Sequence, residues 1–205
     1  MSERPMLDVS DLPTVAFGAR ASIWWGAVGI MAIEGTMFAI MAASYFYLRG
    51  NAAEWPPTGA FHPGLGLTTA NLAILLASMI PMHYAAKAAH KEDLDGIRRP
   101  LIVATVLIAA VIVLRFVILS RLTYRWDSHA YGSLIWTTAG LHTLHLITGM
   151  IENILFIVLL IKGPVEDKHL VDVRVNTLYW YFVALSWVPF YVIFFLDPGL
   201  LDLSY

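Results

Sequence analysis

The sequence predicts an all-α membrane protein, built as a bundle of five membrane-spanning helices. Of its 205 residues, 59% are apolar and only 14% are charged, and the mean hydropathy is +0.68. A soluble domain of this size carries more charge. Five apolar stretches are each long enough to cross a bilayer core, which takes about 20 helical residues. There is no cysteine, which excludes disulfides, thiolate metal sites and cysteine nucleophiles, and the net charge of -2 gives no reason to expect a nucleic-acid partner.

The chain starts with a polar segment, residues 1–22, that lacks the apolar run of a cleavable signal peptide. We expect this segment to remain on the protein at the cytoplasmic side. The first span is predicted over about 23–48 and contains a single carboxylate, Glu34. Repeated prolines and glycines between Trp55 and Gly66 then predict a loop.

The other four spans follow from the same alternation of apolar and polar segments. The charged stretch before Pro100 predicts a break, with Pro100 in the first turn of the next helix, and the polar stretch 165–174 predicts a loop. Gly163 and Pro164 predict the end of the fourth span. The predicted spans are 67–89, 101–122, 131–161 and 176–196.

Lysine and arginine counts predict the orientation, because positively charged loops stay in the cytoplasm. Only three of these residues fall on the side of the membrane opposite the N-terminus, namely Arg49, Arg121 and Arg125. The N-terminal side holds nine, namely Arg4, Arg20, Lys87, Lys91, Arg98, Arg99, Lys162, Lys168 and Arg174. We therefore expect the N-terminus inside and the C-terminus outside.

The fourth span carries the most informative polar residues, His142, His145 and Glu152, at hydrocarbon depth. Spacings of three and seven predict that they share one helix face, which must meet protein because such groups need partners inside a membrane. Glu34 and Glu152 both lie roughly 14 to 17 Å from the inner surface and could face each other. Arg115 lies closer to the outer surface, where it could extend outward or pair with a lipid phosphate.

A simple role for these groups is hydrogen bonding between helices. Ligation of a b-type haem needs two histidines from different helices at similar depth, and the only other histidine within a span, His83, lies far from His142 and His145. A metal site formed by the two histidines with a glutamate would lack further ligands. A proton or ion path through the acidic pair would lack a second polar layer toward the inner surface.

Four sequence blocks, in the same order, resemble subunit III of the haem-copper oxidases in its short five-helix form. This is the family of the cytochrome c and quinol oxidases. The first two blocks are Glu34, Phe38, Tyr45, Phe46, Leu48 and Arg49, and then Trp55, Pro56, Pro57 and Gly59. The other two are Pro63, Asn71, Leu75, Leu76 and Ser78, and then Tyr131, Gly132, Ser133, Gly140, His142, His145 and Gly149.

Three departures from the family pattern suggest a divergent member. The third span has Arg115 and no carboxylate, whereas the family usually has a glutamate there. The last span reads Trp-Tyr-Phe-Val-Ala from Trp180, where the family usually has Trp-His-Phe-x-Asp. Thr143 replaces the glycine between the two histidines.

The resemblance implies an accessory, non-catalytic subunit of a respiratory terminal oxidase in the bacterial inner membrane. Such a subunit holds no cofactor itself, because haem and copper are expected in partner subunits. It packs against subunit I and other oxidase subunits, holds phospholipid in a cleft, and supports proton uptake during oxygen reduction. Carried over by position, Glu34, His142 and His145 would be internal or lipid-cleft polar residues, and Glu152 and Arg115 are further candidates for this role. Glu152 has no family counterpart, and we hypothesise that it replaces a lost acidic partner of Glu34.

The alternatives to an oxidase subunit are a component associated with a nitric oxide reductase and a small proton-coupled transporter.

Overall fold

The computed structural model describes residues 17–18, 21–60 and 64–196, and within these ranges the chain is helical, without strands. Five helical stretches are long and apolar enough to cross a membrane, which confirms the predicted number of spans. The elements are α1 (Ser22–Asn51), α2 (Leu65–Ala77), α3 (Met79–His90), α4 (Leu94–Ser120), α5 (Ala130–Lys162), α6 (Asp167–Tyr191) and the π-helical turn η1 (Val192–Leu196). Most of the predicted N-terminal segment and the residues after 196 lie outside the described ranges.

The second span is divided between α2 and α3 at Ser78. Pro81 has no N–H group to bond to the carbonyl of Ala77, so the regular hydrogen-bond ladder is interrupted here. The Ser78 side chain is fully buried and accepts a hydrogen bond of 3.0 Å from the indole of Trp180 on α6. The two halves together form one span, Leu65–His90.

Two helices begin earlier than the sequence predicted. The third span starts at Leu94 rather than near Leu101, because Asp93 caps the helix by accepting a hydrogen bond of 2.9 Å from the Gly96 amide. Pro100 therefore lies inside α4 and not in its first turn. The fifth span likewise starts at Asp167, after a capping box, so the predicted loop at 165–174 is wrong for most of its length.

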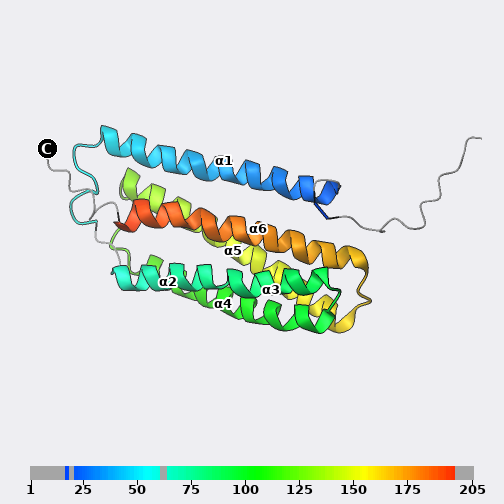
Figure 1. The fold of residues 1–205 in the computed structure, drawn as a ribbon. Coiled ribbons are helices and arrows are strands. Elements are labelled where there is room, and N and C mark those ends of the chain that lie inside the picture. Colours follow the sequence, from blue (N-terminus) through cyan, green and yellow to red (C-terminus); the bar gives the residue numbers. More distant parts are fainter. Residues whose placement is uncertain (1–16, 19–20, 61–63, 197–205) are drawn as a thin grey trace, which may run out of the picture.

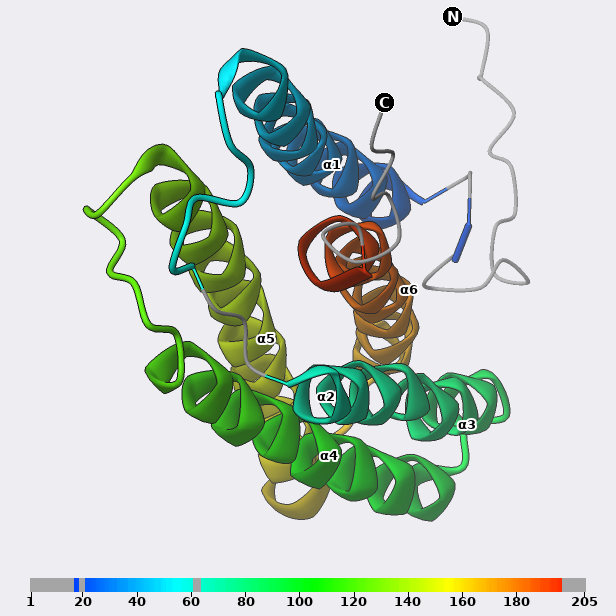
Figure 2. The ribbon, with the colours of Figure 1, turned by 90° about the vertical axis from the view of Figure 1, so that its left-hand side faces the viewer.

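The helices run side by side with α6 near the centre of the bundle (Figures 1 and 2). One side of α6 packs against α1 and α5, and the other packs against α2 and α3. Helix α4 closes the bundle by packing against α2, α3 and α5. Helix α1 lies at the edge of the bundle. Only 11% of the residues in its most apolar stretch are buried, compared with 39% for α4. Much of α1 is therefore left for contact with lipid or other subunits.

Candidate functional site

Glu34 is the centre of a polar cluster that joins α1, α5 and α6. The hydroxyl of Tyr179 lies 2.9 and 3.1 Å from the two Glu34 carboxylate oxygens. The Nε2 atom of His145 lies 3.5 Å from the same carboxylate. The side chains of Glu34 and His145 are 21% and 14% exposed, so the cluster lies close to the bundle surface. A buried or half-buried carboxylate inside a membrane needs such partners.

The other nitrogen of His145 determines what the histidine offers to Glu34. Its Nδ1 atom lies 2.6 Å from the Leu141 carbonyl oxygen, and a carbonyl can only accept, so Nδ1 carries a hydrogen. Nε2 then either carries a second hydrogen, as imidazolium, or faces the carboxylate without one. Nε2 is therefore the nitrogen through which His145 can pair with Glu34.

His142 lies one turn before His145, but it has different partners. It is fully buried, its Nε2 atom lies 3.0 Å from the Val183 carbonyl on α6, and its ring packs 4.6 Å from the ring of Trp187. The ring of Phe38 contacts both histidines, at 6.2 and 5.4 Å between centroids. His142 thus contributes to the contact between α5 and α6.

Glu152 does not share the buried face of His142, so that part of the predicted face is wrong. Glu152 is exposed, and it is Asn153 that is fully buried. With 3.6 residues per turn, positions 142 and 153 lie just over three full turns apart and align, whereas 145 and 152 point to a neighbouring side. Asn153 accepts a hydrogen bond of 2.8 Å from Asn176 on α6, a contact that sequence reasoning missed.

Glu34 and Glu152 both line one groove between α1, α5 and α6, with a volume of about 520 Å³. Its wall also includes Asp172, Asn176 and Tyr179. The remaining lining residues are mostly apolar: Ala27, Ile30, Thr148, Leu155, Phe156 and Val175. The groove therefore combines three carboxylates, one from each of the three helices, with a mostly apolar lining. The direct hydrogen-bond partner of Glu34 is Tyr179, in a contact that the sequence did not reveal.

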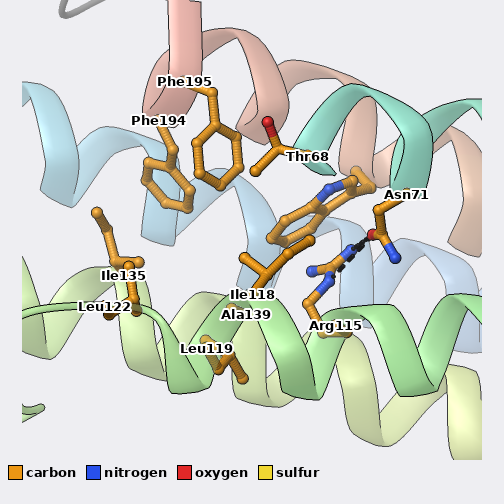
Figure 3. A pocket seen from close by; sticks show the side chains of 11 residues that line it. Thr68, Asn71, Arg115, Ile118, Leu119, Leu122, Ile135, Ala139, Phe194 and Phe195 are labelled. Atoms are coloured by element: carbon orange, nitrogen blue, oxygen red, sulfur yellow. Dashed lines mark hydrogen bonds between the residues drawn. The ribbon is translucent and has the colours of Figure 1, made fainter. Parts of the chain in front are cut away.

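Arg115 is buried in the bundle, so the prediction that it extends to the membrane surface is wrong. Its residue exposure is 1%. Its Nε and Nη2 atoms donate to the Asn71 side-chain oxygen at 3.3 and 3.0 Å, and its guanidinium carbon lies 3.7 Å above the Trp187 ring (Figure 3). One sign of this pair was visible in the sequence, because Asn71 and Arg115 are polar residues within two consecutive spans. Arg115 does not extend outward, because Asn71 of α2 and Trp187 of α6 lie against its guanidinium.

In the described part of the chain, no group of three or more His, Cys, Asp or Glu side chains is arranged to hold a metal ion. The family model for cytochrome c oxidase subunit III matches residues 14–197. The chain belongs to the cytochrome c oxidase subunit III family. The five helices and this membership make it a multi-pass membrane protein that associates with other oxidase subunits.

Individual relatives from distant organisms agree with membership of the cytochrome c oxidase subunit III family. A probable cytochrome c oxidase subunit 3 of Nocardia farcinica is 32% identical over 80% of this chain and 82% of its own length. The cytochrome c oxidase subunit 3 of Thermostichus vulcanus is 26% identical over 83% and 85% of the two chains. That of Coturnix japonica is 30% identical over 88% of this chain and 70% of its own.

The blocks that resemble the cytochrome c oxidase subunit III family occupy contact points between helices. Asn71 bonds Arg115, and Ser78 bonds Trp180. Trp55 packs edge-on against Tyr45 and Tyr131, at 5.4 and 4.9 Å between ring centroids. Pro63, from the third block, lies outside the described residues. These positions connect helices that lie far apart in the sequence.

Proposed function

We propose that this chain is an accessory, non-catalytic subunit of a haem-copper oxidase and stabilises the catalytic subunit I, with haem and copper held by the partner subunits. The observation that carries the proposal is how the internal polar groups are used. Glu34 is bonded by Tyr179, and His142 is bonded to the Val183 carbonyl. These side chains serve contacts between helices, as expected of a structural subunit.

We place a phospholipid in the groove between α1, α5 and α6. The apolar wall suits acyl chains, and the three carboxylates Glu34, Glu152 and Asp172 favour a headgroup that carries a positively charged amine. The groove is open along one side of the bundle and lies next to α1, the helix with the least buried surface. A lipid here would fix α1 against α5 and α6.

We also propose that the Glu34 and His145 pair supports proton uptake by the oxidase. The support is geometric: Nε2 of His145 faces the Glu34 carboxylate at 3.5 Å, which brings an imidazole and a carboxylate together beside the groove. Glu34 and Glu152, two of the three carboxylates that line the groove, would then be accessible from its opening. The pair would act as a proton reservoir beside the catalytic subunit.

For localisation, we propose the bacterial inner membrane, with the N-terminus inside and the C-terminus outside. The support is the excess of lysine and arginine on the N-terminal side of the spans. In this orientation the α3–α4 turn and the α5–α6 loop face the cytoplasm. The groove, lined by the first half of α1 and by Asp172, then opens in the cytoplasmic half of the membrane.

The proposal is tested by purifying the chain through a tag in mild detergent and recording an absorption spectrum with identification of the co-purifying chains. We expect haem absorbance that tracks subunit I and is lost when this chain is isolated. A colourless oligomer of this chain alone would favour the transporter, and a coloured isolated chain would overturn the non-catalytic assignment. Reduction of nitric oxide instead of oxygen by the complex would favour association with a nitric oxide reductase.

A further inference from the structure

The buried guanidinium of Arg115 has no anionic partner among the residues that the structure describes. Its bonds are to the neutral side chain of Asn71 and to the face of the Trp187 ring. Its third nitrogen, Nη1, is buried and makes no hydrogen bond. A buried charge without a counter-charge costs several kcal/mol, and a buried donor without an acceptor adds to that cost. The site is therefore incomplete as the protein alone presents it.

A small cavity lies next to this guanidinium. Its lining includes Arg115, Asn71, Thr68 and Trp187, and otherwise consists of apolar side chains. Figure 3 shows Nη1 on the side of the guanidinium away from Asn71, which points it into the space between the lining residues. The cavity has a volume of about 10 Å³, which is at the lower limit for one water molecule, so a monatomic anion, which is larger than water, needs a small outward shift of the apolar lining side chains.

The polar groups of the cavity favour an anion over a water molecule. The Asn71 amide donates to the Val111 carbonyl, and the Thr68 hydroxyl donates to the Leu65 carbonyl. Nη1 of Arg115, which carries the charge, is a donor of this cavity that remains without an acceptor. A water must also place two hydrogens on acceptors, and the apolar walls offer few, whereas an anion needs only donors and would neutralise the buried charge.

We propose that this cavity binds one small monovalent anion, of the size of chloride, on Arg115. The cavity lies near one end of the bundle, because its wall includes Leu122, which lies just beyond the end of α4 at Ser120, and Phe195 of η1. Both lie at the same end of the bundle as the α4–α5 loop. The anion bonds the nitrogen of Arg115 that Asn71 and Trp187 leave unpaired, and so strengthens the contact of α4 with α2 and α6.

The test measures thermal unfolding of the purified oxidase complex that contains this chain, in chloride or gluconate at constant ionic strength. Gluconate is too large for the cavity. Over a hundredfold increase in chloride we expect the midpoint to rise by about 1 °C or more, because a ligand that binds only the folded state stabilises it, and the shift is smaller the larger the complex that unfolds. The Arg115→Gln variant should lose this rise, while the matched variant Arg121→Gln, which removes an exposed arginine of the same helix end, should keep it.

A second variant and a direct measurement make the test independent of whether Arg115→Gln assembles. Ala139→Val fills the cavity without removing the charge, and it should also abolish the chloride dependence. Crystals of the unmodified complex soaked in bromide should show an anomalous peak beside Arg115. No peak, a chloride dependence that persists in Arg115→Gln, or density in the cavity that is unchanged without halide would each overturn the anion site, the last in favour of bound water.

Discussion

The Tyr179 hydroxyl on α6 lies within hydrogen-bond distance of both carboxylate oxygens of Glu34 on α1. Helix α1 has little buried surface, so this bond and the nearby contact of Glu34 with His145 are specific polar links between it and the bundle. The same carboxylate lines the groove in which we place a lipid. The position of α1 and the chemistry of the groove are therefore linked through one side chain.

Removing this bond should loosen α1. We expect Tyr179→Phe to lower the free energy of unfolding by about 1–3 kcal/mol, because a carboxylate loses a hydrogen-bond donor in a low-dielectric setting. Tyr181→Phe is the matched control, since its hydroxyl bonds His83 on the bundle surface, at 3.1 Å. The measurement is the thermal unfolding midpoint of the purified complex. Equal effects of the two variants would contradict the special role of Tyr179.

The hypothesis that Glu152 acts with Glu34 predicts energetic coupling across the groove. We expect Glu34→Gln and Glu152→Gln to be non-additive by about 0.5 kcal/mol or more, because carboxylates that share one groove repel each other and each substitution relieves the other residue. Unfolding of the two single variants and the double variant measures this. Additive effects would show that Glu152 acts independently of Glu34.

Close approach of α5 and α6 depends on Gly149. A Cβ atom added there would lie 2.9 Å from the ring of Trp180, which is fully buried and cannot move aside. We expect Gly149→Ala to destabilise the protein by about 1–3 kcal/mol through overpacking. Gly140→Ala, on the same helix, would meet nothing within 4 Å, and should be neutral or stabilise by under about 1 kcal/mol. Comparable losses at both sites would contradict this account.

Asn71 should matter because it is the hydrogen-bond acceptor for Arg115. Asn71→Leu leaves the guanidinium buried with fewer partners, and we expect a loss of about 3 kcal/mol or more. Replacing both residues, as Asn71→Leu with Arg115→Met, should recover much of that loss because no charge remains buried. Unfolding midpoints of the single and double variants decide this. A double variant less stable than Asn71→Leu would show that the charge itself stabilises the fold.

The orientation can be tested with single introduced cysteines, because the chain has no cysteine of its own that would react with the label. A cysteine at Ser128, in the loop between α4 and α5, should react with a membrane-impermeant maleimide on intact cells. A cysteine at Lys91, in the turn between α3 and α4, should react only after permeabilisation. Both positions are exposed. The reverse pattern would invert the proposed topology.

Helix ends show where sequence reasoning reached its limit. The charged stretches before Leu101 and Asn176 predicted loops, yet α4 and α6 begin at Leu94 and Asp167. Charge and a proline suggested a break, but local capping by Asp93 and Glu166 allows polar residues to form the first turns of a helix. Hydropathy reports where a chain can be buried, and only the caps decide where the helix starts.

The sequence by itself determined the class of fold, the number of spans and the family. An apolar stretch long enough to cross the membrane is expected to be helical, because its backbone polar groups must form hydrogen bonds within the same segment. The blocks from Glu34 to Gly149 indicated the family, which the match to the family model and the similarity to known relatives confirm.

Only the tertiary structure decided which partner each internal polar residue has. The sequence showed that Glu34 and His142 need partners, but not that these are Tyr179 and the Val183 carbonyl. For Arg115 it suggested an outward position, whereas the structure pairs it with Asn71. Helical periodicity gives the side on which a residue lies only relative to its own helix. The rotation of each helix against its neighbours depends on packing, such as Gly149 against Trp180, and that packing pairs the polar groups.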